Sequence, residues 1–346
     1  MKVFVTGNNG YIGTVMVPML LINDFEVSGL DSDLFEGSVF GDESIAGGIA
    51  KIPYLRKDIR DINVEDLKNV DAVVHLCALS NDPLGNFNPD ITSEINHEGS
   101  VRLAKMAKKA GVKKYVFSSS CSVYGASDNI LTEESQVNPL TAYAVSKVRA
   151  EKDISKLADS KFCPTFLRSS TAYGLSPMLR FDLVVNNFVA WAFTKGKVLL
   201  KSTGNAWRPF VHIEDISRAF IAVLDAPRDL VYNQIFNVGQ NEENYRIKEI
   251  AEIVRELVPN SELEFAEGAE PDTRSYHVEF DKIKETLTEF KPKWDVPSGG
   301  KQLYDAYKKV DLRVEDFEGP RYRRITNLEN SVKSGRLDKN LRRTDV

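Results

Sequence analysis

The stretch Val5-Thr6-Gly7-Asn8-Asn9-Gly10-Tyr11-Ile12-Gly13 follows a short apolar run and precedes an apolar segment that reaches Ile22. Its glycines have the spacing Gly-x-x-Gly-x-x-Gly. Glycine permits a tight turn and lets backbone N–H groups at the start of a helix approach a phosphate. A strand, a glycine turn and a helix in this order are typical of a dinucleotide-binding unit, although a turn before a helix also selects glycine by itself.

A carboxylate ends the second predicted strand. Asp31 closes Val27-Ser28-Gly29-Leu30 and lies 24 residues after Gly7. There a carboxylate accepts hydrogen bonds from both ribose hydroxyls of an adenosine and repels a 2′-phosphate. Because Ser32 and Asp33 follow it and no basic residue does, the pattern favours NAD over NADP; the alternative is an ordinary strand-end turn residue. Asp58 and Ile59 follow another strand-like stretch and are candidates for binding the adenine.

Short apolar runs alternate with amphipathic stretches through the first half of the chain. This rhythm is typical of an α/β protein with a doubly wound parallel sheet. Strands are expected at 3–6, 25–30, 72–76, 115–118 and 165–168, and helices at 12–22, 94–110 and 140–157. In the second half, helices are expected at 181–193, 214–224 and 246–258, and strands at 211–213 and 234–238.

The predicted domain organisation has three parts. Residues 1–168 form an NAD-binding Rossmann domain, to which 206–238 return, and residues 169–205 and 239–315 form a smaller substrate-binding lobe. Residues 316–346 form a basic tail, with eight Lys and Arg from Arg321 onward against three acidic residues. Such a run is most often a solvated helix or a loose terminus; docking onto a subunit partner is the alternative.

Composition excludes several classes of protein. The chain has 346 residues, 45 basic and 50 acidic side chains and a net charge of −5, which argues against nucleic-acid or membrane binding. Three cysteines without C-x-x-C spacing, at 77, 121 and 163, favour neither a disulfide framework nor a zinc site, and four scattered histidines predict no metal. A cytoplasmic protein is the expectation.

A tyrosine and a lysine stand four residues apart in Thr141-Ala142-Tyr143-Ala144-Val145-Ser146-Lys147. On a helix both side chains share one face. The ammonium lowers the pKa of the phenol, so Tyr143 can take a proton from an alcohol near neutral pH. A hydroxyl-rich segment, Ser118-Ser119-Ser120-Cys121-Ser122, ends a predicted strand, where doubly wound sheets bind ligands. Together they form a serine–tyrosine–lysine set for interconverting an alcohol and a ketone.

With these motifs the chain resembles the extended short-chain dehydrogenase/reductase superfamily, in its nucleotide-sugar epimerase/dehydratase branch. The matching motifs follow one another over residues 1–310: T-G-x-x-G-Y-I-G from Thr6, D-I-R-D from Asp58, V-V-H-L-C-A at 73–78, S-S-S-x-x-V-Y-G at 118–125, Y-x-x-x-K at 143–147, L-R-x-x-x-x-Y-G at 167–174, R-P-F-V-H-I-E-D at 208–215 and F-N-V-G at 236–239. Residues 177–187 also resemble a subgroup of sugar-nucleotide C4 oxidoreductases and epimerases.

The resemblance implies roles for individual residues. It makes Tyr143 the catalytic base, Lys147 its partner and Ser120 a hydrogen-bond donor to the reacting oxygen. It implies cofactor contacts for Gly7, Gly10, Tyr11, Ile12, Gly13, Asp31, Ser32, Asp58, Ile59, Leu76, Ala78, Asn96, Ser118, Tyr143, Lys147 and Ser170. Substrate contacts are implied for Ser120, Thr171, Arg180, Arg208 and Arg274, with Arg208 and Arg274 on the substrate diphosphate; each arginine is otherwise an ordinary salt-bridge residue.

One departure from the family pattern bears on the reaction. Nucleotide-sugar 4,6-dehydratases resemble S-T-D-E-V-Y-G at this point, whereas this chain has Cys121 and Ser122 in place of the acid pair. The expected activity is therefore an NAD-dependent nucleotide-sugar 4-epimerase, with a net C4 dehydrogenase or ketoreductase as the alternative. A 4,6-dehydratase or a non-catalytic NAD-binding protein ranks below both. The motifs leave open the nucleotide and the sugar, and the resemblance implies a homodimer.

Overall fold

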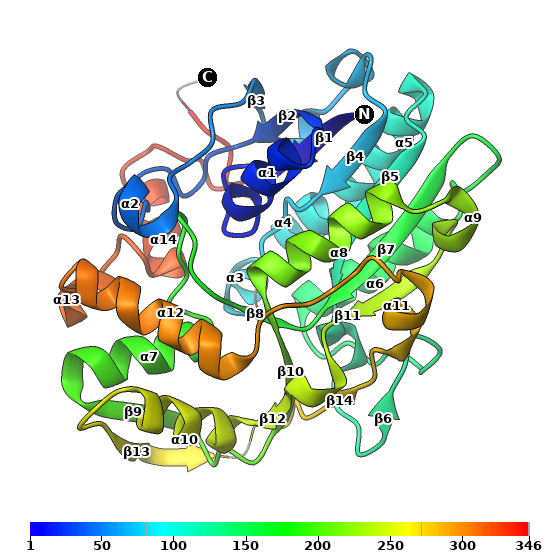
Figure 1. The fold of residues 1–346 in the computed structure, drawn as a ribbon. Helices are drawn as coiled ribbons and strands as arrows, with labels where there is room; N and C mark the ends of the chain where they lie inside the picture. The colour runs from blue at the N-terminus through cyan, green and yellow to red at the C-terminus, as the bar shows by residue number, and fades with distance from the viewer. Residues whose placement is uncertain (81, 271, 345–346) are drawn as a thin grey trace.

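The structure, a computed structural model, describes residues 1–80, 82–270 and 272–344. Its centre is a seven-stranded sheet in the order β11-β7-β5-β4-β1-β2-β3, in which every neighbouring pair is parallel (Figure 1). The strands are β1 (Lys2–Thr6), β2 (Glu26–Asp31), β3 (Tyr54–Arg56), β4 (Ala72–His75), β5 (Lys114–Ser120), β7 (Cys163–Ser169) and β11 (Ile235–Val238). The expected doubly wound α/β fold is confirmed, with β3 and β11 at its edges.

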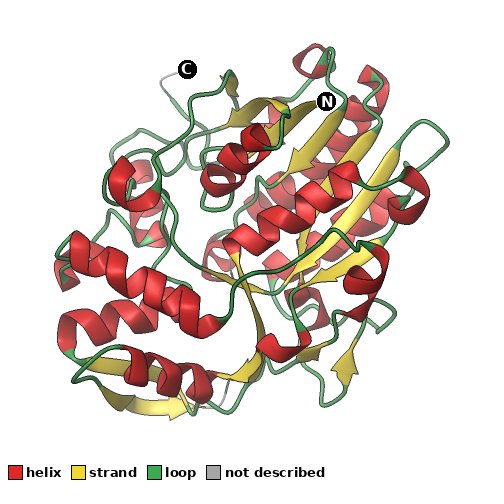
Figure 2. Ribbon diagram, viewed as in Figure 1, coloured by secondary structure: helices red, strands yellow, loops and turns green. Residues whose placement is uncertain are grey.

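Helices cover both faces of this sheet (Figure 2). In β1, Val3 and Val5 face one core while Phe4 faces the other, because side chains alternate along a strand. The first core lies under α1 (Gly13–Ile22) and α8 (Ile213–Asp225). The second lies under α5 (Ser100–Ala110) and α6 (Ala142–Ser155). Strands buried on both faces explain the near-continuous apolar runs in the sequence.

The expected helix at 94–110 is not uniform, because its first part, η3 (Glu94–Gly99), is a π-helix. Shorter helices complete this half of the molecule: α2 (Glu43–Ala46), α3 (Asp82–Phe87), α4 (Pro89–Ser93), α9 (Arg228–Val231), α11 (Asp281–Thr286), η1 (Ile59–Asp61), η2 (Glu65–Leu67), η4 (Cys121–Tyr124) and η5 (Asn241–Glu243). A small parallel pair joins β6 (Ile130–Leu131) to β14 (His277–Val278).

A smaller lobe lies beyond the carboxyl ends of the sheet. Its strands are β8 (Thr171–Tyr173), β10 (Trp207–His212) and β12 (Asn244–Arg246) in one sheet, and β9 (Lys197–Ser202) with β13 (Glu262–Glu270) in another. Three helices pack on one another over these strands: α7 (Val184–Lys195), α10 (Ile247–Leu257) and α12 (Val296–Lys309). None of the helices in the described part of the chain combines the length and the apolar character that a bilayer crossing requires.

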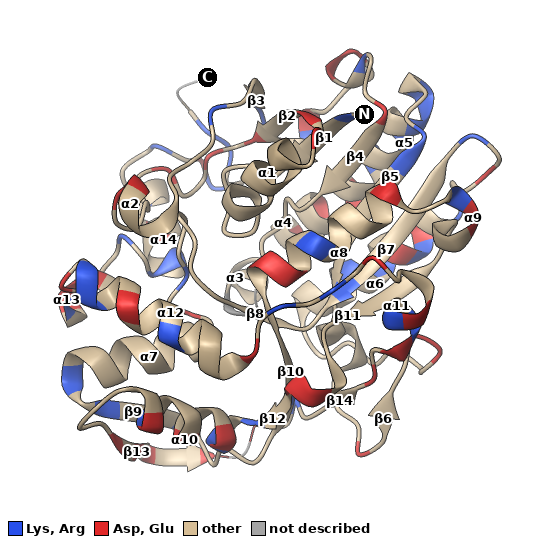
Figure 3. Ribbon diagram, viewed as in Figure 1, with Lys and Arg blue, Asp and Glu red and all other residues tan. Residues whose placement is uncertain are grey.

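The basic C-terminal segment packs against its own chain. We call residues 313–344 the C-terminal cover; they contain α13 (Val314–Phe317) and α14 (Arg324–Lys333). Leu328, Leu337 and Leu341 are buried in the second core, which is why this segment differs from the solvated helix or loose terminus expected from its charge. Figure 1 shows the cover, in red, beside α2 and the β2–β3 end of the sheet. Lys and Arg are interspersed with Asp and Glu over the molecule (Figure 3).

Candidate active site

A cavity of about 1530 Å³ lies at the carboxyl ends of the central strands. Its lining comes from the glycine turn, from the ends of β2, β4, β5 and β7, from α6, from the lobe and from the C-terminal cover. In a doubly wound sheet this is the position where ligands bind. Every predicted site residue except Asn96 lines the cavity.

The backbone around Gly7 and Gly13 leaves no room for a side chain at either position. A Cβ atom on Gly13 would lie 2.1 Å from the Gly7 carbonyl oxygen, and one on Gly7 would lie 3.0 Å from the Cys77 amide nitrogen. Gly7 also has a φ of +77°, which disfavours any other residue. The turn therefore brings bare backbone to the cavity at the start of α1, and this geometry fits a diphosphate.

Asp31 faces the cavity at the end of β2. Its carboxylate accepts hydrogen bonds from the backbone N–H groups of Asp33 (2.9 Å) and Asn9 (3.0 Å). Burial nevertheless raises the pKa of Asp31 to about 6. A partly buried carboxylate with remaining lone pairs suits a pair of ribose hydroxyls, as predicted for NAD.

Two other predicted cofactor residues are engaged with protein groups. The Asp58 carboxylate forms a salt bridge with Arg60 (Nη2–Oδ2, 2.6 Å), while Ile59 beside it is buried and lines the cavity. Asn96 lies behind the lining, where its amide oxygen accepts from the Leu79 N–H and its amide nitrogen donates to the Leu79 carbonyl. Asn96 thus positions a backbone segment that does line the cavity.

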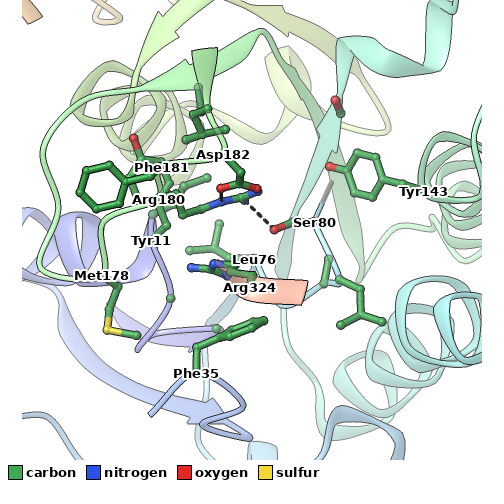
Figure 4. Close-up of a pocket in the computed structure, with 18 of the residues that line it drawn as sticks. Tyr11, Phe35, Leu76, Ser80, Tyr143, Met178, Arg180, Phe181, Asp182 and Arg324 are labelled. Atoms are coloured by element: carbon green, nitrogen blue, oxygen red, sulfur yellow. Dashed lines mark hydrogen bonds and ion pairs between the residues drawn. The ribbon is translucent and has the colours of Figure 1, made fainter. Parts of the chain in front are cut away.

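Tyr143 and Lys147 are held by α6. Thr141 caps this helix, its hydroxyl accepting the Ala144 N–H at 3.2 Å. The Lys147 ammonium donates to the Ser118 carbonyl (2.6 Å) and lies 5.7 Å from the centre of the Tyr143 ring. Burial lowers the pKa of Lys147 to about 8. Figure 4 shows Tyr143 at the cavity, and Ser120 lines the same space.

A buried network that the sequence did not reveal stands behind these residues. The Arg168 guanidinium pairs with Glu151 (Nη2–Oε2, 2.7 Å) and donates to the Tyr124 hydroxyl (3.0 Å). Ser119 also donates to Glu151. Glu151 follows Lys147 by four residues on α6, so the network ties α6 to β5 and β7. That four-residue spacing was the signal available in the sequence.

The two positions that depart from the dehydratase pattern differ in their surroundings. Cys121 is fully buried, does not line the cavity, and its thiol donates to the Arg168 carbonyl at 3.1 Å. Burial raises the pKa of this thiol well above its ordinary value. Ser122 does line the cavity, and its hydroxyl has no hydrogen-bond partner among the described residues.

The predicted substrate arginines form ion pairs at the cavity wall. Arg208 and Arg274 share the Asp272 carboxylate (Nη2–Oδ2, 2.9 Å, and Nε–Oδ1, 3.0 Å). Arg180 pairs with Asp182 (2.6 Å) and donates to the Ser80 hydroxyl (2.9 Å), as Figure 4 shows. The Arg180–Asp182 and Arg208–Arg274–Asp272 groups lie on cavity-lining segments, and Thr171 and Ser170 lie on the same wall.

Known proteins have sequences similar to that of this chain. A family model for the NAD dependent epimerase/dehydratase family matches residues 3–239. A Methanocaldococcus jannaschii protein, named provisionally as a UDP-glucose 4-epimerase, is 27% identical over 315 residues, 88% of this chain and 98% of that protein. A dTDP-D-glucose 4,6-dehydratase of Bos taurus is 27% identical over 76% of each chain.

Solved structures share the fold. The structure of UDP-glucuronic acid 4-epimerase from Bacillus cereus, in complex with UDP-glucuronic acid and NAD, has a TM-score of 0.77 and 22% identity, covering 90% of this chain and all of that one. The family match covers more than half of the chain, including the glycine turn and the Tyr143–Lys147 pair. The chain belongs to the NAD dependent epimerase/dehydratase family and is an NAD-dependent enzyme of the extended short-chain dehydrogenase/reductase type.

Proposed function

We propose that the protein is a nucleotide-sugar 4-epimerase that oxidises C4 of the sugar and then reduces it again. The observation that carries this proposal is the convergence of Tyr143, Lys147 and Ser120 on the cavity that the glycine turn also lines. A proton acceptor, a cation beside it and a hydroxyl donor are the groups that alcohol oxidation requires.

In the proposed reaction Tyr143 transfers the proton, while Ser120 and Lys147 position and stabilise the reacting groups. Tyr143 takes the proton of the C4 hydroxyl, and the Ser120 hydroxyl donates a hydrogen bond to the same oxygen. The Lys147 ammonium stabilises the Tyr143 phenolate, since an opposite charge favours the ionised form. The glycine turn and Asp31 would hold NAD, which when bound would supply a hydride acceptor for C4 and a hydride donor to the opposite face of the sugar.

The arginines of the lobe support a substrate with a diphosphate. Arg208 and Arg274 present guanidinium groups beside a single carboxylate, so their combined charge is positive. A guanidinium forms paired hydrogen bonds with phosphate oxygens. Anchoring at the diphosphate leaves the sugar free to turn between the two hydride transfers, which epimerisation at C4 requires.

The acid pair of a dehydratase is replaced in this chain by Cys121 and Ser122. Cys121 is buried away from the cavity and donates to a backbone carbonyl, and Ser122 is a hydroxyl. Neither forms an acid–base couple for eliminating water. This observation favours epimerisation or net C4 oxidoreduction over dehydration, although relatives of this chain include named dehydratases.

The test is a panel of UDP-, GDP-, CDP- and dTDP-sugars incubated with the protein, with and without added NAD. We expect a C4 epimer, identified by mass and NMR, without accumulation of NADH absorbance. Stoichiometric NADH with a 4-keto or oxidised product would indicate the net dehydrogenase instead. Loss of water from the product would indicate a dehydratase, and no turnover with any sugar would contradict the proposal.

We also propose a homodimer that pairs through two helices, one of them α6, as the superfamily resemblance implies. Light scattering of the purified protein tests this. We further propose a cytoplasmic location, because three cysteines without C-x-x-C spacing are typical of a protein in a reducing compartment.

A further inference from the structure

The C-terminal cover closes one side of the cavity with residues outside the family match, which ends at 239. Aromatic contacts fix its first part: the Phe317 ring lies 5.5 Å from Phe181, and Tyr322 lies 5.1 Å from the same ring. Its last part is bound to the loop after β2, where Arg336 donates to the Leu34 carbonyl at 3.0 Å. The cover is therefore a packed wall of the cavity.

Arg324 is the first residue of α14 and lines the cavity at this wall. Its guanidinium lies 4.3 Å from the centre of the Phe35 ring, and Figure 4 shows it beside Arg180 and Leu76. Its charge acts on Tyr11, within the glycine turn, and on Asp31, at the ribose position. Arg324 thus lies near both the diphosphate position and the adenosine position.

Arg324 lacks a direct ion-pair partner within the described part of the chain, although the carboxylates of Asp182 and Asp31 act on it from a distance. Arg180 has Asp182 as its partner, whereas Arg324 forms no hydrogen bond or ion pair with any residue in the ranges 1–80, 82–270 and 272–344. Burial, and then the positive charge of Arg180, lower the pKa of Arg324 to about 9. Placing a second guanidinium here costs stability unless an anion occupies the space between them.

We infer that Arg324 binds the diphosphate of NAD, so that the C-terminal cover contributes directly to the cofactor site. The glycine turn holds this diphosphate from the sheet side, and Arg324 approaches it from the cover. A guanidinium offers paired hydrogen bonds to phosphate oxygens, and the amino end of α14 adds a favourable dipole. The inference rests on the cofactor of the family and not on the epimerase reaction.

The experiment compares the full-length protein with R324Q and with K333Q. Lys333 lies at the other end of α14 and is exposed, so K333Q removes the same charge from the same helix without touching the cavity. Protein freed of nucleotide is titrated calorimetrically with NAD, and ADP and adenosine are tested by displacement. ADP carries the diphosphate and adenosine lacks it. Thermal unfolding is measured with and without NAD.

We expect R324Q to weaken NAD and ADP about tenfold or more, the size of a lost hydrogen bond to a charged group, and to leave adenosine unchanged. Without ligand, R324Q should melt no lower than the parent protein, because it removes a repulsion. K333Q should match the parent throughout. Unchanged or tighter NAD binding would overturn the inference, as would an equal loss for adenosine accompanied by a lower melting temperature.

Discussion

Two walls of the cavity differ in how far their charged groups are paired within the protein. On the sheet wall, formed by the glycine turn, Asp31, Ser120, Tyr143 and Lys147, charged groups have partners inside the protein, as Lys147 has in the Ser118 carbonyl. On the arginine wall, formed by Arg180, Arg208, Arg274 and Arg324, four guanidinium groups face two bound carboxylates, Asp182 and Asp272. We propose that the first wall is preorganised for proton transfer and that an anionic ligand offsets the surplus positive charge of the second.

The largest effect should come from the sheet wall. Y143F removes the proton acceptor and keeps the ring, so we expect kcat to fall about 10³-fold, within the usual range for a general base. NAD affinity should stay within a factor of about two, because the glycine turn and Asp31 remain. Steady-state kinetics and calorimetry measure the two quantities.

Y304F is the matched control for Y143F. Tyr304 lies on α12 and packs against Phe193 with ring centres 6.0 Å apart, outside the cavity lining. It should turn over like the parent enzyme. Substantial activity in Y143F would show that the sheet wall does not carry the proton transfer.

The sheet wall could be predicted from the sequence because its signals are local. Gly7, Gly10 and Gly13 lie within one turn, Asp31 ends the next strand, and Tyr143 and Lys147 are one helical turn apart. The pleat and the helix repeat then carry these residues to one edge of the sheet. The supporting network was missed, since Arg168 and Glu151 become partners only when β7 packs beside α6.

The arginine wall was predicted in part, and only through the family resemblance. Arg208 and Arg274 matched known motifs, but Asp272, which joins them, gives no sequence signal of its own. Arg324 was not predicted as a site residue, because it lies in a run of basic residues and such runs are usually solvated. Its ring partner, Phe35, is 289 positions away, and the burial of Leu328, Leu337 and Leu341 depends on that distant contact surface.

An intermediate effect should come from the arginine wall. R274Q removes one of the two guanidinium groups on Asp272, so a substrate diphosphate would lose a charged hydrogen-bond donor. We expect KM for the nucleotide sugar to rise about tenfold and kcat to stay within about twofold, because the interaction binds substrate and transition state alike. The kinetics are measured at saturating NAD.

A comparison with R255Q separates this role from a general change of charge. Arg255 lies on the solvent side of α10 and does not line the cavity. R255Q should keep the parent KM. If R274Q lowered kcat and left KM unchanged, Arg274 would belong functionally with the sheet wall, and the division between the walls would fail.

The smallest expected effect is the pH dependence of NAD affinity, which should differ from that of nucleotide-sugar binding. Burial raises the pKa of Asp31 to about 6 in the free protein, so below that pH the carboxyl holds a proton that must leave before it accepts both ribose hydroxyls. NAD affinity should therefore fall with acidity, about twofold at pH 6 and about fourfold at pH 5.5 relative to pH 7.5. The side chain of D31N cannot titrate, so the weaker NAD affinity of this variant should not change with pH over this range.

Arginines keep their charge throughout, so binding of the nucleotide sugar at the arginine wall should vary less between pH 5.5 and 7.5 than binding of NAD. Calorimetric titrations of both ligands across this range test the point, and a parallel decline of the two affinities would show that the walls are not electrostatically distinct.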